Sequence, residues 1–415
     1  MDSPDPKGYA SEQGQRYFFS KRAQYQLDIC KIKSVKYALK YVCVFIESSA
    51  DDASKGETNP GLQSSVSVDT CPSMEEADDR EEDDKPKEIL IVDPDTDELD
   101  MNHQRIGKLE NLEPLTKVER LYFRWNFIKK IENLETLVTL RELELYDNQI
   151  TCIENLDSLV NLEILDLSFN RIREIKGLEN LHNLEKLFLC ANKISRIENV
   201  NHLKKLTLLE LGDNKIRASF SIPDLLSCIS YERHLRKPTS KYQSIEFVTR
   251  LFHLQVIENL EGLDNLKCLY LGKNKITKIQ NLETLKTLDV LSLQCNRLTK
   301  IENLETLTEL DQLYLSENGL TRIEGLDKNL KMTTLDLANN KIRVIENVDH
   351  LAMLEEFWMN DNLVDDWTSI ETLNSNKKLV TIYLEHNPVF KDPNYRRKIK
   401  ISLPWVSQID ATLCR

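Results

Sequence analysis

The chain has 415 residues, of which 55 are Lys or Arg and 68 are Asp or Glu, so its formal net charge is −13. This balance argues against general binding to nucleic-acid phosphates, which requires an excess of Lys and Arg. Apolar residues make up 40% of the sequence, enough to form a core, and this excludes disorder throughout the chain. The nine cysteines include no CxxC pair, and neither a signal peptide nor a membrane segment is visible. We therefore expect an intracellular protein with reduced thiols.

The first 98 residues differ in composition from the rest of the chain. Residues 1–74 show no sustained period and include a stretch rich in Ser, Asp, Thr and Pro, so we predict a disordered N-terminal extension. Residues 75–98 form an acidic segment around the run EEADDREEDD. Such a run is typical of a solvated, self-repelling tail. A competitor for a basic surface on a partner is the alternative interpretation.

A 22-residue pattern, L-x-x-L-x-L-x-x-N-x-I-x-x-I-E-N-L, repeats from residue 99 onward. Its Asn positions are Asn126, Asn148, Asn170, Asn192, Asn214, Asn274, Asn296, Asn318, Asn340 and Asn362, with Gln104 in the first phase and Asn387 in the last. A 22-residue unit with L-x-L before an Asn is a leucine-rich repeat. The alternating L-x-L predicts a short strand, and the Asn side chain can bond backbone groups left unpaired by the following turn.

We therefore predict an α/β leucine-rich-repeat solenoid over residues 99–387. A curved parallel sheet should line its concave face, with 3-10 or short helices on its convex face. Terminal coils expose their core unless they are capped, so residues 388–415 are expected to form a C-terminal cap with a short helix around Tyr395–Ser402. The spacing from Asn214 to Asn274 is 60 rather than 22, which predicts a 38-residue inserted loop at residues 219–256. We expect this loop to leave the sheet intact.

Motifs for catalysis and for metal binding are missing from the sequence. The seven histidines form neither HExxH nor a zinc-type cluster, and there is no GxGxxG, GxxxxGK[ST] or GxSxG motif. Cys190, Cys268 and Cys295 occupy positions that take small residues within the repeats, so packing or plain surface explains them better than chemical reactivity does. We therefore expect a protein that is not an enzyme and that has no metal or cofactor.

The outward side chain in the middle of each L-x-L lies four residues before the repeat Asn. This column consists of Tyr122, Glu144, Asp166, Phe188, Glu210, Tyr270, Ser292, Tyr314, Asp336, Trp358 and Tyr383. Six of its eleven members are aromatic, four are acidic, and none is Lys or Arg. Exposed rings among carboxylates suit a protein partner with apolar pockets and basic rims, and they would repel nucleic acid. The adjacent column adds Glu142, Gln312 and Glu356.

Four stretches carry a more specific resemblance, namely LYDNQI, LGKNKITK, EFWMNDNL and YLEHNPVFKDPNYRRKI. Over about residues 93–218 and 257–415 the chain resembles the protein phosphatase 1 regulatory subunit 7 family. The resemblance implies a non-catalytic regulator that binds the catalytic subunit of protein phosphatase 1 through its concave face. It also implies a monomer within a heterodimer or larger complex, found in nucleus and cytoplasm and connected with mitosis. The partner-contacting positions that it implies are Asp166, Phe188, Glu210, Tyr270, Glu356, Trp358 and Tyr383.

A structural adaptor of the axonemal or spliceosomal type would share this fold without binding a phosphatase. Fold alone does not separate the two functions, because one fold hosts many functions. The Glu356–Trp358 motif and the cap motif favour the phosphatase regulator. The sequence does not indicate whether binding activates, inhibits or stabilises the phosphatase.

Overall fold

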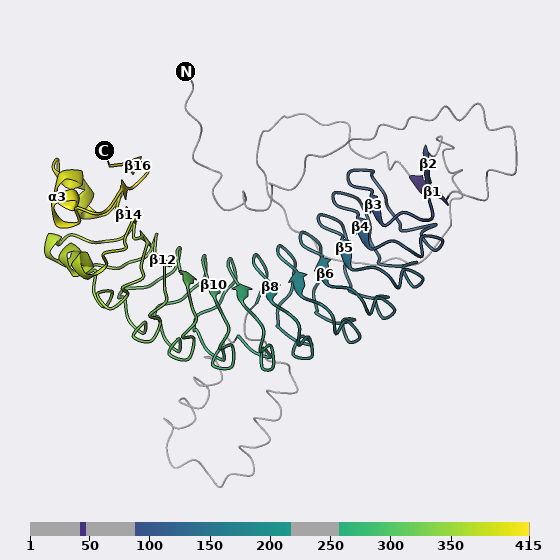
Figure 1. The fold of residues 1–415 in the computed structure, drawn as a ribbon, viewed down its shortest axis with the longest axis horizontal. Coiled ribbons are helices and arrows are strands. Elements are labelled where there is room, and N and C mark those ends of the chain that lie inside the picture. The colour runs from purple at the N-terminus through teal and green to yellow at the C-terminus, as the bar shows by residue number, and fades with distance from the viewer. Residues whose placement is uncertain (1–41, 47–87, 217–256, 415) are drawn as a thin grey trace, which may run out of the picture. The chain divides into compact units, whose positions relative to one another are not determined.

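The computed structural model describes residues 42–46, 88–216 and 257–414, and the statements below concern these residues. Residues 98–216 and 257–414 build a stack of repeating coils (Figure 1). Each coil contributes one short strand to a single sheet, and the chain then returns on the opposite side through turns. None of the helices in the described part of the chain is long and apolar enough to span a membrane.

The sheet contains fourteen strands in chain order, from β3 to β16. They are β3 (Glu98–Asp100), β4 (Arg120–Tyr122), β5 (Glu142–Glu144), β6 (Ile164–Asp166), β7 (Lys186–Phe188), β8 (Leu208–Glu210), β9 (Cys268–Tyr270), β10 (Val290–Ser292), β11 (Gln312–Tyr314), β12 (Thr334–Asp336), β13 (Glu356–Trp358), β14 (Thr381–Tyr383), β15 (Gln408–Ile409) and β16 (Thr412–Leu413). All neighbours pair in parallel except β15 and β16, which pair antiparallel. The predicted parallel-sheet solenoid is confirmed.

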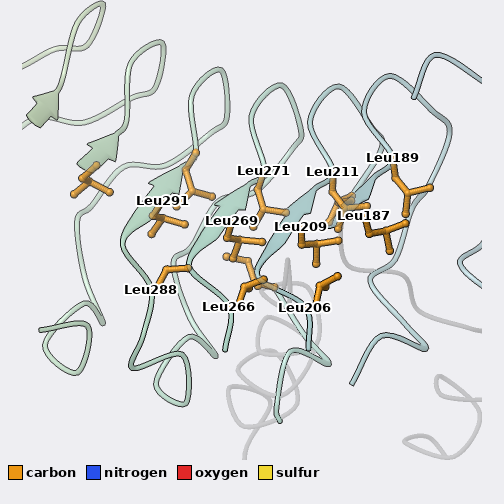
Figure 2. Close-up of a cluster of buried hydrophobic side chains, with 14 of the residues drawn as sticks. Leu187, Leu189, Leu206, Leu209, Leu211, Leu266, Leu269, Leu271, Leu288 and Leu291 are labelled. Carbon is orange, nitrogen blue, oxygen red and sulfur yellow. The ribbon is translucent and has the colours of Figure 1, made fainter. Parts of the chain in front are cut away.

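The core consists of stacked Leu, Ile and Val side chains from equivalent positions of successive coils (Figure 2). The central strand residues Leu187, Leu209, Leu269 and Leu291 are all fully buried, each one packed beside its register partner. Each coil contacts only its two neighbours, so the core extends by one layer per repeat. The repeat pattern therefore sets both the fold and the direction in which its surfaces run.

The repeat asparagines form a buried ladder at the turn that follows each strand. Asn148 accepts a hydrogen bond from the N–H of Ile128 at 3.0 Å and donates to the carbonyl of Phe123 at 2.8 Å. The residue before each Asn adopts a left-handed backbone, as Asp147 does with φ 52°. Such a backbone is strained for residues other than Gly, and the bonds of the buried amide hold it in place. The ladder predicted from the sequence is confirmed.

A second ladder was not predicted, and it uses the Asn of the I-E-N-L motif. Asn155 has φ 60° and donates to the carbonyl of Ile131 at 2.7 Å, and Asn303 bonds Ile279 in the same way. Glycine replaces this Asn in two coils, as Gly177 with φ 69° and Gly325 with φ 71°, and at Gly177 an added Cβ would lie 2.6 Å from the Ile153 carbonyl oxygen. The recurrent Asn therefore fixes the left-handed turn on the returning side.

The C-terminal end of the sheet is covered by η3 (Trp367–Ser375), η4 (Pro388–Lys391) and α3 (Tyr395–Ser402). Helix α3 spans the range predicted from the sequence. Its buried Tyr395 donates a hydrogen bond to Asp410 at 3.1 Å, and the same carboxylate accepts from the N–H of Leu384 at 3.0 Å. Regular 3-10 helix is limited to η3 and η4 among the described residues, whereas the other coils return through turns.

Two features of the N-terminal region and the insertion bear on the predicted boundaries. Strand β1 (Val42–Ile46), within the extension predicted to be disordered, pairs antiparallel with β2 (Glu88–Val92), a pairing that the sequence interpretation did not include. The rest of residues 1–87 lies outside the described residues. The predicted insertion at 219–256 also lies outside them, but β8 and β9 on either side pair directly, with Leu209 opposite Leu269. The sheet is therefore continuous past this point.

Candidate functional site

The eleven-residue column read from the sequence forms one unbroken row on the outer side of the sheet. Register pairs join its members strand by strand, from Tyr122 opposite Glu144 to Trp358 opposite Tyr383. We call this surface the strand face. Neighbouring strands lie about 4.8 Å apart, so the row from Asp166 to Tyr383 extends over roughly 38 Å. The predicted site residues therefore share one surface, but they do not all converge on one point.

Three predicted residues come together at the C-terminal end of the strand face. The rings of Trp358 and Tyr383 are stacked, with centroids 4.5 Å apart and planes inclined by 15°. Trp358 donates its indole N–H to Glu356 at 3.4 Å, and the Tyr383 hydroxyl accepts a hydrogen bond from Gln408 at 3.0 Å. The rings are half-buried and Glu356 is exposed, so this group presents apolar area beside an accessible carboxylate. Gln408 follows the last repeat, so the repeat pattern carried no signal for it.

The other four predicted residues lie on consecutive strands. Asp166, Phe188, Glu210 and Tyr270 are successive register partners on β6, β7, β8 and β9. Burial raises the pKa of Asp166, although its bonds to Ser168 oppose the rise. Burial also raises the pKa of Glu210, which bonds the thiol of Cys190. Phe188 lies between these two half-buried carboxylates in the row, and a cationic group from a partner would find less competing water there than on an open surface.

Ser292, Tyr314 and Asp336 connect the two groups of predicted residues along the row. Asp336 accepts hydrogen bonds from the N–H of Ala338 at 3.0 Å and from the side chain of Gln294 at 2.9 Å. Burial raises the pKa of Asp336 despite these bonds. Tyr314 bonds Gln312 at 2.9 Å, so the polar groups in this central part are already satisfied within the chain.

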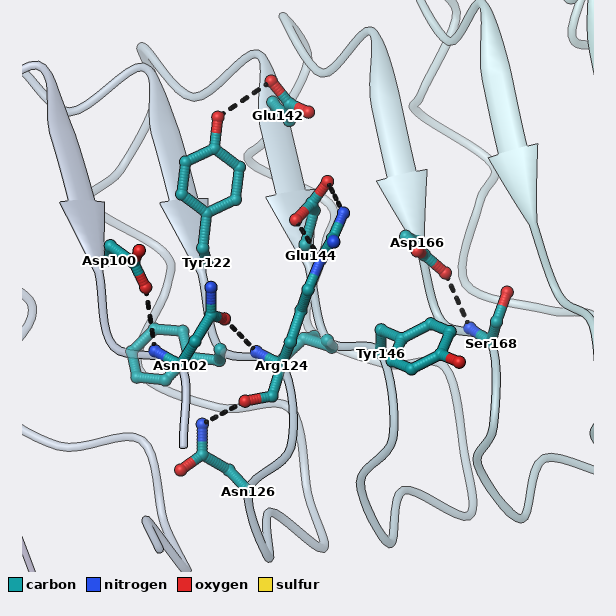
Figure 3. A network of polar contacts seen from close by, with 12 residues as sticks. Asp100, Asn102, Tyr122, Arg124, Asn126, Glu142, Glu144, Tyr146, Asp166 and Ser168 are labelled. Carbon is teal, nitrogen blue, oxygen red and sulfur yellow. Dashed lines mark hydrogen bonds and ion pairs between the residues drawn. The ribbon is translucent and has the colours of Figure 1, made fainter. Parts of the chain in front are cut away.

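An ion pair that sequence reasoning missed occupies the N-terminal end of the strand face (Figure 3). Arg124 lies 2.5 Å from Glu144; the Glu144 side chain is buried and that of Arg124 is half-buried. Burial raises the pKa of Glu144 to about 7, although Arg124 opposes this shift. Burial alone would lower the pKa of Arg124, but its bond to Glu144 and the carboxylates around it raise it overall. Arg124 comes two residues after Tyr122, so strand alternation could have placed it on the same face as the row.

Exposed aromatic side chains continue from this end onto the turns after the strands. His103 and Trp125 are stacked with centroids 4.2 Å apart, Trp125 meets Tyr146 edge-on at 5.5 Å, and Tyr146 meets Phe169 at 4.9 Å. Trp125 and Phe169 have 42% and 45% of their surface exposed, so this group is accessible. No group of three or more His, Cys, Asp or Glu placed to hold a metal occurs among the described residues.

Comparison with known families agrees with the repeat geometry. A family model described as "Leucine-rich repeat" matches residues 299–412, and a model described as "Leucine Rich repeats (2 copies)" matches residues 138–180. Both models describe leucine-rich repeats, and together they match less than half of the chain. Both matched ranges contain the buried Asn ladder, which is the structural basis of this repeat.

Curated relatives share a short, well-matched stretch with this leucine-rich-repeat chain. Protein phosphatase 1 regulatory subunit 7 of Homo sapiens is 49% identical over 53 residues, and that of Xenopus tropicalis is 53% identical over 53 residues. Protein phosphatase 1 regulatory subunit pprA of Dictyostelium discoideum is 39% identical over 67 residues. These alignments cover 13%, 13% and 16% of this chain and 15%, 15% and 20% of the relatives. The resemblance predicted from the sequence is confirmed over this part of the repeats.

Solved structures share the fold over a larger part of the chain. An internalin from Listeria monocytogenes superposes with a TM-score of 0.58 and 21% identity, covering 78% of this chain and 91% of that one. A leucine-rich-repeat protein of Leptospira interrogans superposes with a TM-score of 0.53 and 20% identity, covering 74% and 76%. At this level of identity the likeness concerns the fold alone.

Proposed function

We propose that the chain is a non-catalytic regulatory subunit that binds the catalytic subunit of protein phosphatase 1 through its strand face. The fold and the names of the curated relatives point to a regulator rather than an enzyme, and they suggest protein phosphatase 1 as the partner. The proposal includes a monomeric chain within a heterodimer or larger complex. It also includes a location in nucleus and cytoplasm and a connection with mitosis, for which fractionation and imaging are the tests.

The observation that carries the proposal is the stacked pair Trp358–Tyr383 beside the exposed carboxylate of Glu356. Large rings at the centre of an interface supply much of its binding energy, and a neighbouring carboxylate can bond an Arg or Lys of the partner. The stack preorganises both rings, so less side-chain freedom is lost when a partner covers them. Asp166 and Glu210 extend the same preference for cationic groups along the face.

The proposal is tested by calorimetric titration of the purified chain with the phosphatase catalytic subunit. Trp358→Ala should weaken binding by ~2–4 kcal/mol, or roughly 30- to 1,000-fold in Kd. Glu356→Ala should also weaken it, whereas Glu356→Asp should have a smaller effect because a carboxylate remains. Leu330→Ala is the matched control, since Leu330 is an exposed apolar residue, with 54% of its surface accessible, that lies outside the strand face.

Thermal unfolding of the same variants separates a binding role from a structural role. Loss of one aromatic stack should cost ~0.5–1.5 kcal/mol of stability, so Trp358→Ala should stay folded. If the catalytic subunit does not bind the wild-type chain, the structural-adaptor alternative gains support. If it binds the Trp358→Ala chain as tightly as the wild type, the strand-face site is wrong even when the partner is right.

A further inference from the structure

A second surface follows the edge of the sheet where the chain leaves the strands. The residue after each ladder Asn is exposed in most coils, and its N–H bonds a carbonyl of the preceding coil. These N–H···O distances are 2.8 Å for Arg171, Lys193, Lys215 and Arg297 and 3.4 Å for Lys275. We call these five residues the exit row. The shared backbone bonds place their side chains one coil apart, at steps of about 4.8 Å.

The exit row gathers five cations on consecutive coils of a chain whose net charge is −13. Among the described residues, none of the five forms an ion pair or a side-chain hydrogen bond. Some cations elsewhere are paired across neighbouring coils, as Arg141 is with Glu163 at 2.5 Å and Arg322 with Glu346 at 2.9 Å. Like charges stacked at this spacing repel one another. The five cations of the row therefore repel one another, and an anionic partner would reduce this repulsion.

Exposed rings border the N-terminal end of the exit row. Phe127 occupies the equivalent position two coils before Arg171, and its N–H bonds the Ile106 carbonyl at 2.8 Å. Phe127 and its neighbours Trp125 and Phe169 have 39%, 42% and 45% of their surface exposed. Ring contacts link Trp125 and Phe169 through Tyr146, and Phe169 lies two residues before Arg171, so exposed apolar area lies near this end of the row.

We propose that the exit row binds an extended acidic segment of a partner protein, with an apolar side chain of that segment packed on Trp125, Phe127 and Phe169. From Arg171 to Arg297 the row spans roughly 19 Å, which an extended chain covers with about six residues. Alternate carboxylates of such a segment lie roughly 7 Å apart, within reach of flexible Lys side chains. Single-stranded nucleic acid also combines anions with rings that stack. Successive bases of a single strand stack on rings along their groove, whereas the exposed rings Trp125, Phe127 and Phe169 lie only at one end of the row, and this favours the peptide.

The experiment uses the full chain and labelled synthetic peptides in fluorescence anisotropy titrations. The probe has about eight alternating Glu and Asp residues. One version carries a Phe at its N-terminus, a second carries it at its C-terminus, and a third has no Phe. The triple variant Lys193→Gln, Lys215→Gln and Lys275→Gln should weaken binding at least roughly tenfold, and raised salt should weaken binding to the wild type. Trp125→Ala should weaken only the binding of the peptides that carry Phe.

The matched control is the triple variant Lys267→Gln, Lys286→Gln and Lys328→Gln, which removes the same charge from exposed positions outside the row. Equal losses in the two triple variants would show a general charge effect and overturn the proposal. Tighter binding of oligouridylate than of the peptides would assign the row to nucleic acid instead. If the peptide binds only after residues 75–84 are deleted, the chain's own acidic run is the occupant rather than a partner. The phosphatase titration should be unchanged in the exit-row variant, so the two proposals fail independently.

Discussion

The buried amide of Asn148 provides a quantitative test of how the repeat is stabilised. Its oxygen accepts from the N–H of Ile128, and its nitrogen donates to the carbonyl of Phe123. It also bonds the carbonyls of Leu145 and Tyr146, but these retain Asn170 and the N–H of Trp125 as partners. Asn148→Ala therefore removes the described partners of two buried backbone groups. At ~1–3 kcal/mol for each, the loss should be ~2–6 kcal/mol.

Urea unfolding at constant pH, followed by circular dichroism, measures this loss. Asn161→Ala is the control, because the exposed Asn161 makes one bond of 2.9 Å to the carbonyl of Val138, where water can replace it. We expect the control to cost less than ~1 kcal/mol. The slope of the unfolding free energy against urea should stay the same, since the exposed surface on unfolding does not change. Equal losses for Asn148→Ala and Asn161→Ala would show that the ladder does not hold the turn.

Three further predictions concern the core, the returning turn and the strand-face ion pair. Leu335→Ala should cost ~2–5 kcal/mol in the same assay, because Leu335 is fully buried. Gly177→Ala should cost ~1–3 kcal/mol, and Gly177→Asn should cost less, since Asn occupies the left-handed position in sister coils. The folded-state pKa of Glu144, about 7, lies above its ordinary value of 4.5, so its contribution to stability should fall as pH rises between these values. Glu144→Gln should remove this part of the pH dependence; an unchanged dependence would contradict the assignment.

The sequence predicted the sheet, the core and the Asn ladder because all three follow from one repeated pattern. Each coil repeats the same contacts, so a wrong assignment of inward and outward residues in one coil would disagree with the 22-residue spacing of the others. The second ladder was visible in the same pattern through the Asn of I-E-N-L, but its function depends on a left-handed backbone angle that no side-chain pattern shows. The strand pair β1–β2, which joins residues 42–46 to residues 88–92, was not predicted, because neither segment belongs to the repeat that sets the register of the other strands.

The candidate site divides in the same way between what alternation predicts and what it does not. Alternation placed Trp358 and Tyr383 on one face, and the structure adds that they stack. It did not predict that Arg124 would neutralise Glu144, because the interpretation stopped at two columns per strand. The contact from Gln408 to Tyr383 comes from the cap, beyond the last repeat, where periodicity ends. That Asp166, Phe188, Glu210 and Tyr270 contact a partner protein stays a prediction.

Core and ladder use fixed positions in each coil, which leaves outward positions free to vary, among them the middle of the strand and the position after the Asn. On the strand face these positions carry rings and carboxylates, and on the exit row they carry cations. From Arg171 to Arg297 the exit row follows the same coils as part of the strand face, so charges of opposite sign lie on adjacent surfaces, and the cations of the exit row form no ion pairs with the described residues. A basic partner on the strand face and an acidic segment on the exit row would then be bound side by side. Substitutions in one row should leave the affinity of the other row for its partner unchanged. The described side-chain bonds of Trp358 and Tyr383 go to Glu356 and Gln408, and neither ring bonds a cation of the exit row.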